Sequence, residues 1–297
     1  MDRLAIAGAF RELQNSICSQ LERLDGVAQF GDDPWQRLEG GGGLSRPIAN
    51  GKLIEKGGVN FSEVFGPLTP QAAKALNVVA DEFYATGVSI VLHAHSPWVP
   101  TIHMNIRYFE TNAGQWFGGG IDLTPAYMDL EVAKHFHKRL KEMCDRWDPD
   151  FYQRFKPWAD DYFFLPHRNE TRGIGGIFFD RLMADADHRM EDLFGFTCDV
   201  GELFAPLYAE VVSPTRDRAF GAPEKKWQLL RRGRYVEFNL VHDRGTKFGL
   251  DTGGRTESIL MSLPAEASWR YDHHPEPGSL EAETIAWLRK GIDWIHP

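Results

Sequence analysis

The chain has 297 residues, of which 42% are hydrophobic, and its formal net charge at pH 7 is -9. This size and composition are typical of a globular protein with one or two domains and a substantial core. The acidic balance argues against nucleic acid or an anionic membrane as a partner, and no apolar run is long enough to predict a membrane-spanning helix.

The cysteines and the N-terminal residues indicate in which cellular compartment the protein is expected. Cys18, Cys144 and Cys198 show no C-x-x-C spacing, which argues against an iron–sulfur cluster, a zinc ribbon and a disulfide framework. The N-terminus has an acidic second residue and a helical period instead of a basic start and an apolar block, so we predict no secretory signal. We therefore expect a cytoplasmic protein without stable membrane insertion.

The first 85 residues predict two helices and a group of short strands. Apolar residues at steps of three and four predict a helix over residues 4–24, with Gly26 as its C-terminal stop. The glycine run at residues 40–43 lacks the Gly-Lys-Ser/Thr ending and the following helix of a phosphate loop, so we expect a mobile loop or close backbone packing there. Residues 48–65 predict short strands joined by turns at Asn50-Gly51 and Gly57-Gly58. Thr69-Pro70 and Gly87 bracket a predicted helix over residues 70–85.

Residues 89–125 form the stretch around which the rest of the chain is organised. Residues 102–109 alternate with period two, which predicts a strand with one core face and one polar face. The polar face carries His103, Asn105 and Arg107 in a row, about 7 Å apart. The following run W-F-G-G-G-I-D-L-T-P predicts a second strand whose three consecutive glycines have no side chains. Such a strand indicates that another backbone or a flat ligand comes close. The alternative is an ordinary solvated face of an antiparallel sheet.

The second half of the chain predicts further helices and strands. We expect a helix over residues 129–147, in which only one of His135 and His137 can face a site because they point about 200° apart. Residues 156–180 predict a helix end, a polar loop with His167 and Arg172, and a glycine-rich strand. Residues 181–227 predict helix with a break at 213–214, residues 231–245 an alternating strand, residues 247–263 a turn and an apolar strand, and Ser279 the start of a last helix. Because the strands come in adjacent runs, we predict a single α+β domain over residues 1–297, with a largely antiparallel sheet covered by helices.

Arginines beside glycines occur in four separate segments. The guanidinium fork binds carboxylates at two points, so a flat ligand with several carboxylates would explain both the arginines and the bare backbone. Structural ion pairs with the 42 acidic residues are the alternative. The arginines concerned are Arg107, Arg231, Arg232, Arg234, Arg244 and Arg255.

Five long motifs carry a resemblance to a known family. They are T-I-H-M-N-I-R-Y-F-E, W-F-G-G-G-I-D-L-T-P, K-P-W-A-D-D-Y-F-F-L-P-H-R-N-E-T-R-G-I-G-G-I-F-F-D, R-R-G-R-Y-V-E-F-N-L-V-H-D-R-G-T-K-F-G-L and G-G-R-T-E-S-I-L-M-S-L-P. Together they resemble the oxygen-dependent coproporphyrinogen-III oxidases, from Gln14 to Tyr271. The resemblance implies a large flat antiparallel sheet sandwiched between helices, and a homodimer formed by strands around residues 235–269. It also implies the oxidative decarboxylation of two propionates of coproporphyrinogen III to vinyl groups, with O₂ as co-substrate and no organic cofactor.

The resemblance also assigns site residues. It implies substrate contacts by Ser89, Asn105, Ile106, Arg107, Gly253, Gly254 and Arg255. It implies catalytic roles for His103 as proton donor and for Asp122, Asp243 and Arg244. For bacterial members it implies a divalent metal such as manganese, held by His93, His103, His137 and His167. Ala159 stands where the family pattern usually has cysteine, and Ala94 and Ser96 replace the usual Pro and Asn, so no thiol role is inherited at residue 159.

The residues themselves agree with this chemistry. A porphyrinogen is an electron-rich tetrapyrrole that reacts with O₂ itself, so the protein has to position it and to manage protons and charge. Asp122 or Asp243 can take or hold a pyrrole N–H proton, an arginine can hold the departing propionate, and His103 can exchange a proton near neutrality.

Two other interpretations remain open at this point. One is a different metal-dependent enzyme with His93, His95, His103, His137 and His167 around one ion, and the other is a tetrapyrrole carrier without chemistry. The lack of a cysteine triad excludes the radical-based route to the same product.

Overall fold

A seven-stranded antiparallel sheet forms the centre of the protein, in the spatial order β1-β2-β3-β4-β5-β6-β9. The computed structural model describes residues 1–70, 73–74, 77–251 and 254–297. The strands of the sheet are β1 (Asp33–Gln36), β2 (Gly41–Ala49), β3 (Ile54–Pro67), β4 (Glu82–Ala94), β5 (Thr101–Thr111), β6 (Gly114–Thr124) and β9 (Gly176–Leu182). Two short strands, β7 (Phe164–Leu165) and β8 (Glu170–Thr171), pair beside it.

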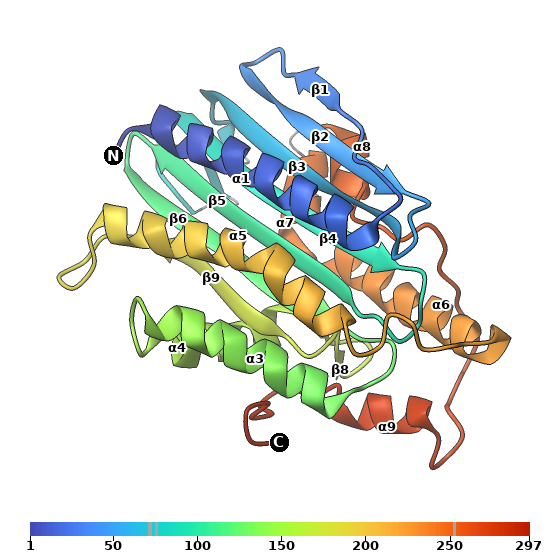
Figure 1. Ribbon diagram of the computed structural model, residues 1–297. Helices are drawn as coiled ribbons and strands as arrows, with labels where there is room; N and C mark the ends of the chain where they lie inside the picture. The colour runs from blue at the N-terminus through green and yellow to red at the C-terminus, as the bar shows by residue number, and fades with distance from the viewer. Residues whose placement is uncertain (71–72, 75–76, 252–253) are drawn as a thin grey trace.

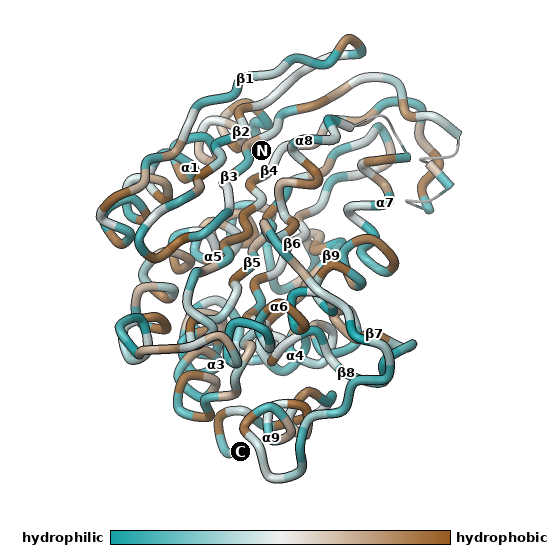
Figure 2. The backbone as a smooth tube through the Cα atoms, turned by 90° about the vertical axis from the view of Figure 1, so that its right-hand side faces the viewer, coloured by the Kyte–Doolittle hydropathy of each residue, from teal (hydrophilic) through white to brown (hydrophobic). Residues whose placement is uncertain are grey.

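Helices cover both faces of the sheet, as Figures 1 and 2 show from two directions. One layer holds α1 (Arg3–Asp25), which packs on β3 and β4, and α5 (Met190–Val212), which packs on β5 and β6. On this side α3 (Leu130–Asp145) contacts α5, and α4 (Phe151–Tyr162) packs along the edge strand β9. The other layer holds α6 (Ala222–Glu237), the π-helical turn η1 (Phe238–His242), α7 (Arg244–Asp251) and α8 (Thr256–Leu260), and α9 (Leu280–Trp287) lies near the C-terminus. The predicted α+β sandwich is confirmed.

The two faces of the sheet differ in chemistry because period-two alternation runs through every central strand. Ile90, Met104, Ile121 and Ile177 pair in register from β4 to β9 and are all fully buried against the helices of the first layer. The residues one step along each strand point the other way and are mostly polar or glycine. The apolar face therefore holds the main core, and the opposite face is left for function.

Several sequence predictions are confirmed at their boundaries. Helix α1 ends at Gly26, whose φ of 81° is the left-handed conformation that glycine adopts most readily. Asp129 caps α3 by accepting hydrogen bonds from Glu131 and Val132, and Ser279 caps α9. Among the described residues no helix is long and apolar enough to cross a membrane.

The prediction of strands over residues 231–245 and 247–263 is wrong, because α6, η1, α7 and α8 occupy these segments. The N-terminal signal of α6 lies upstream of the alternating run: Gly221 N–H donates to the Glu224 carboxylate at 2.8 Å, and a proline occupies the first helical turn. Trp227, Leu230 and Tyr235 then share the buried side of α6 at helical spacing. The alternation of polar and apolar residues in 231–245 was a weaker signal than this helical start.

Two further predictions in the N-terminal part are corrected. The helix expected over residues 70–85 is wrong for residues 82–85, which belong to β4, and part of it lies outside the described residues. Gly57-Gly58 is no turn but the middle of β3, where a Cβ at Gly58 would overlap Met261. Glycines 41–43 of the run at 40–43 open β2, and a Cβ on Gly43 would overlap the Phe61 carbonyl oxygen. Close backbone packing, not a phosphate loop, explains these glycines.

Candidate active site

The candidate site lies on the polar face, where side chains from neighbouring strands fall in register. Ser89 on β4 pairs with Asn105 on β5, which pairs with Gly120 on β6. Two residues further along β5, Arg107 pairs with Gly118, and this pair belongs to the same face as Asn105 and Gly120. Since neighbouring strands lie about 4.8 Å apart, a row across β4, β5, β6 and β9 spans roughly 14 Å. These two adjacent rows present the Ser89 hydroxyl, the Asn105 amide and the Arg107 guanidinium beside the bare backbone of the β6 glycines.

The glycines of β6 make room for the guanidinium of Arg107. A Cβ on Gly118 would lie 2.8 Å from Arg107 Nη2 and 2.7 Å from Asp180 Oδ1. Arg107 Nη2 donates to Asp180 at 2.7 Å, and Nη1 donates to Asn105 Oδ1 at 3.0 Å. About a third of each side chain of the Arg107–Asp180 pair is exposed, at 33% and 32%. Arg107 is thus oriented by neighbours but remains open to a ligand.

Asp122 forms the buried end of a three-residue network. Its side chain is only 1% exposed, and its carboxylate accepts two hydrogen bonds from Arg172 Nη2, at 2.7 and 2.6 Å. His103 Nδ1 lies 2.8 Å from Asp122 Oδ1. Burial alone would raise the pKa of Asp122, but the charge of Arg172 and the contact with His103 hold the pKa below its usual value. An ionised Asp122 accepts the Nδ1 proton of His103, so that Nε2 is the nitrogen left for a ligand.

Arg172 is a site residue that the sequence reasoning did not single out. Its guanidinium lies 4.4 Å from the ring centre of Phe163, 4.7 Å from that of Tyr235 and 4.6 Å from that of Phe238. Nη1 also donates to Asn239 Oδ1 at 3.0 Å. This aromatic cage replaces water around a charge that is 2% exposed. The sequence signal was the arginine just before the Gly173–Gly176 segment, but two of the three rings in its cage, Tyr235 and Phe238, come from a distant segment.

Asp243 and Arg244 follow the π-helical turn η1. A π turn adds one residue per turn and often marks a functional site. Here the Asp243 N–H donates to the Phe238 carbonyl at 2.9 Å, and the chain then leaves the helix. Tyr162 donates its hydroxyl to Asp243 Oδ1 at 2.7 Å, and the Thr246 N–H donates to Oδ2, also at 2.7 Å. The Arg244 guanidinium lies 5.2 Å from the centre of the Tyr162 ring.

The structure brings five of the predicted residues to one place. Asp243 lies close enough to His103 for the imidazole to lower the pKa of the carboxyl, although burial, the strongest influence, opposes this. Burial is also the main reason that the pKa of Tyr162 is raised, and the neighbouring charges of Asp243, Arg107 and Arg244 act on the same hydroxyl. His103, Arg107, Asp122, Asp243 and Arg244 therefore form one electrostatic neighbourhood on the polar face.

Other residues predicted to contact substrate lie apart from this neighbourhood. Arg255 pairs with Asp33 on β1 at 2.7 Å, and β2, β3 and β4 separate that strand from β5. This places the Arg255 guanidinium beside β1, which is four strand spacings, or roughly 19 Å, from β5. The Ile106 side chain is fully buried on the opposite face, so only its backbone is near the site. Gly254 donates to the Gly249 carbonyl at 2.7 Å, and Gly253 lies outside the described residues.

The histidines predicted as metal ligands are held in separate hydrogen-bonded settings. His93 is buried between Thr101 Oγ1 at 3.2 Å and the Ser262 carbonyl at 2.9 Å, and burial lowers its pKa to about 3. His137 is likewise buried, with Tyr152 and the Ile174 carbonyl on its two ring nitrogens. In the described ranges no three His, Cys, Asp or Glu side chains are grouped so that they could hold a metal ion. The donor set in this arrangement does not fit a four-histidine metal site, and no chemical step below depends on a metal.

His167 and the arginines of α6 belong to structural networks. His167 Nε2 lies 2.8 Å from Glu237 Oε2, and its Nδ1 lies 2.9 Å from His242 Nε2. The arginines are paired with carboxylates: Arg231 with Glu170 at 2.9 Å, Arg234 with Glu237 at 3.0 Å, and Arg232 with Glu55. For these three arginines the alternative of structural ion pairs is the right one.

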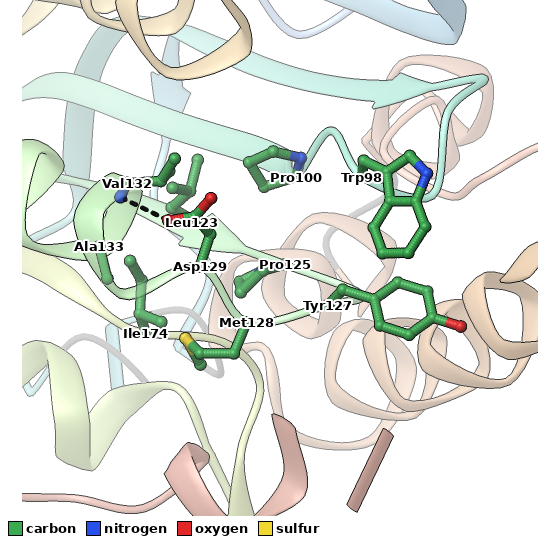
Figure 3. A pocket seen from close by; sticks show the side chains of 10 residues that line it. All are labelled: Trp98, Pro100, Leu123, Pro125, Tyr127, Met128, Asp129, Val132, Ala133 and Ile174. Atoms are coloured by element: carbon green, nitrogen blue, oxygen red, sulfur yellow. Dashed lines mark hydrogen bonds between the residues drawn. The ribbon is translucent and has the colours of Figure 1, made fainter. Parts of the chain in front are cut away.

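A small pocket elsewhere in the protein does not fit a tetrapyrrole. It lies between the end of β6 and the start of α3, beside residues such as Trp98, Tyr127 and Ile174, and its volume is about 10 Å³ (Figure 3). Sites for drug-sized ligands typically have volumes of about 300–1,000 Å³. The carboxylate in this pocket, that of Asp129, is already engaged as the cap of α3. The polar face remains the candidate site.

Comparison with known proteins identifies the family of the chain. The family model described as coproporphyrinogen III oxidase matches residues 5–294. The chain is 49% identical to a soybean (Glycine max) protein named oxygen-dependent coproporphyrinogen-III oxidase, chloroplastic, over 96% of this chain and 77% of the relative. The chain is also 49% identical to the mitochondrial oxygen-dependent coproporphyrinogen-III oxidase of Rattus norvegicus, over 96% of this chain and 67% of the relative. It is 45% identical to the oxygen-dependent coproporphyrinogen-III oxidase of Prochlorococcus marinus, over 96% of this chain and 88% of the relative. The chain therefore belongs to the coproporphyrinogen III oxidase family.

Proposed function

We propose that this protein catalyses the oxygen-dependent conversion of coproporphyrinogen III to protoporphyrinogen IX, the haem-pathway reaction for which its relatives are named. The observation that carries the proposal is the polar face, where Arg107 lies over the bare backbone of Gly118 and where the charges of Arg107 and Asp243 both act on the Tyr162 hydroxyl. A flat, many-armed acid needs such a surface: an open sheet for its ring and a fixed guanidinium for its carboxylate.

The reaction fits a site that has no organic cofactor. Each propionate arm, –CH₂CH₂COO⁻, becomes –CH=CH₂ and loses CO₂, one proton and two electrons. One O₂ accepts the two electrons and, with two protons, becomes hydrogen peroxide. Since the porphyrinogen is itself the reductant, the protein has to supply orientation, charge and proton transfer.

Arg107 and Arg244 are proposed to hold carboxylates of the substrate. Arg107 already donates to Asp180, so a substrate propionate would share or replace that partner at the exposed side of the guanidinium. A planar, two-point contact fixes which arm points toward the reacting centre. Arg244 lies exposed beyond Tyr162 and can meet a second arm.

Asp243 is the better candidate for holding the pyrrole proton. Asp122 is 1% exposed and fully engaged with Arg172 and His103, whereas Asp243 is only partly buried. The proposed role of Asp122 is to orient His103 and to stabilise its imidazolium form when His103 exchanges a proton. Ser89 and Asn105 are proposed to contact the ring from the sheet, and Gly253, Gly254 and Arg255 are also proposed to contact the substrate.

A homodimer and a cytoplasmic location are further parts of the proposal. Where the structure describes residues 235–269, they include the end of α6, η1, α7 and α8 and no strand. This segment presents exposed apolar side chains: Leu240 at 45%, Val241 at 50% and Trp269 at 52%. Burying such side chains in a subunit interface would remove apolar area from water. Sedimentation of the wild type and of Val241→Asp tests the dimer, and cell fractionation tests the location, since relatives are named chloroplastic or mitochondrial.

The proposed activity is tested with the purified protein and coproporphyrinogen III in air. We expect a product whose mass has decreased by two CO₂ and four hydrogens, with two equivalents of peroxide. Arg107→Ala and Asp243→Asn should lose turnover while the circular dichroism of the folded protein is unchanged. Stoichiometric binding without product would favour a carrier instead, and near wild-type turnover in both variants would refute the site.

A further inference from the structure

Tyr162 connects the two halves of the candidate site. It is the last residue of α4, and its ring stacks on Phe178 of β9 with a centroid distance of 4.0 Å and an angle of 14°. The Arg244 guanidinium lies over the same ring at 5.2 Å. The hydroxyl of Tyr162 donates to Asp243 Oδ1 at 2.7 Å. One side chain thus contacts both of the residues that follow η1.

We propose that Tyr162 is the positioning residue that holds Asp243 and Arg244 in their working orientations. This inference rests on the function proposed above and adds a residue to the same site. Tyr162 acts through Asp243 and Arg244, so it is distinct from the residues that meet the substrate.

The local backbone shows why these residues need a support. Arg244 and Gly245 are exposed, and Asp243 stands at the junction where the π-helical turn ends and α7 begins. Of the two carboxylate oxygens, Oδ2 is held by the Thr246 N–H and Oδ1 by Tyr162. Without the tyrosine hydroxyl, Oδ1 would lose this partner, and the carboxylate would depend on the bonds that Thr246 makes from within the same turn. Tyr162 supplies a fixed point because its ring is held by Phe178 and, edge to face, by Phe163 at 5.0 Å.

The charges around Asp243 set the direction of the expected pH effect. Burial raises the pKa of its carboxyl, while the bonds from Tyr162 and Thr246 and the nearby His103 lower it, with a net decrease. Arg172 and Tyr235 also face this carboxylate, and Arg107 and Arg244 act on the Tyr162 hydroxyl. Removing the hydroxyl removes a lowering influence, so the carboxyl should protonate at a higher pH.

The test compares Tyr162→Phe, Tyr162→Leu and a matched control. Tyr127→Phe is the control because Tyr127 also donates to a carboxylate, that of Glu281 at 2.6 Å, outside the candidate site. A hydrogen bond to a charged group corresponds to roughly 10–100-fold in rate when it is needed in the transition state. We expect Tyr162→Phe to lower kcat about ten-fold or more with KM within two-fold, and to shift the acid limb of the rate profile to higher pH. Tyr162→Leu, which also loses the ring, should in addition raise KM, and binding of fluorescent coproporphyrin III should weaken only in this variant.

The outcomes separate this inference from the proposed function. If the wild type forms no product, the proposed function fails. If the wild type is active and Tyr162→Phe keeps its kcat and its acid limb, or if Tyr127→Phe loses as much activity, the positioning role is overturned. If Tyr162→Leu does not fold, the kcat and the acid limb of Tyr162→Phe alone test the positioning role, because this variant keeps the ring and its packing.

Discussion

Replacing Asp122 by asparagine tests whether the negative charge of Asp122 stabilises the protein through its buried ion pair with Arg172. The change keeps the shape of the side chain and removes its negative charge. Arg172, 2% exposed, would then remain as a buried cation facing a neutral amide. The same uncompensated state arises, with opposite sign, in Arg172→Gln.

The expected loss follows from the geometry. With the Arg172–Asp122 bonds at 2.6 and 2.7 Å, the charge centres lie about 4 Å apart, which corresponds to about 4 kcal/mol at an effective dielectric constant near 20. Breaking one side of a buried ion pair typically costs about 3–5 kcal/mol. We therefore expect each single variant to lose about 3–5 kcal/mol of unfolding free energy, a large part of the roughly 5–15 kcal/mol of a typical protein.

A double-mutant cycle measured by urea unfolding checks this reasoning. The double variant Asp122→Asn/Arg172→Gln removes both charges, so its loss should be smaller than the sum of the single losses by about 2–3 kcal/mol. Asp145→Asn is the control, because its partner Lys141 is exposed and such pairs contribute about 0–1 kcal/mol. Additive losses, or single variants within 1 kcal/mol of the wild type, would refute the reasoning.

Three more predictions concern the site glycine, acid stability and metal. Gly118→Ala would place a methyl group 2.8 Å from Arg107 Nη2 and displace the guanidinium. KM should therefore rise about ten-fold, while the unfolding free energy stays within about 1 kcal/mol of the wild type. An unchanged KM would show that this guanidinium does not bind substrate. Burial alone would raise the pKa of Glu237, but hydrogen bonds such as that from Arg168 lower it from 4.5 to about 2. Its stabilising effect is therefore present above pH 4.5 and lost toward pH 2, so the stability difference between wild type and Glu237→Gln should shrink as the pH falls through this window; a constant difference would contradict this sign. Exhaustive chelation, followed by removal of the chelator, should leave turnover unchanged, whereas a loss that added manganese restores would contradict a mechanism without metal.

The local periodicity of the sequence was enough to predict β5, the strand that carries His103, Asn105 and Arg107. Residues 102–108 alternate between apolar and polar side chains, and β5 has one apolar and one polar face there, as predicted. Alternation fixes which side chains share a face, but not which strand lies next to it. The pairing of Arg107 with Gly118, and the use of that glycine as space for a guanidinium, depend on long-range contacts that a local pattern does not contain.

The C-terminal layer shows where local reasoning fails. Residues 231–245 alternate well enough to predict a strand, yet the capped start at Gly221 and the buried side formed by Trp227 and Tyr235 favour a helix. Arg172 was passed over for a related reason: its cage of Phe163, Tyr235 and Phe238 is assembled only by the fold. The resemblance to a family supplied the candidate site residues, but the difference in burial between Asp122 and Asp243 required the structure.

The most direct measurement is a crystal structure of the protein with coproporphyrin III bound. We predict that the ring lies over Gly118 and Gly120, with one propionate on the Arg107 guanidinium and a pyrrole nitrogen within hydrogen-bonding distance of Asp243. A ring bound elsewhere, or an Asp243 carboxylate that points away from its nitrogens, would contradict the account.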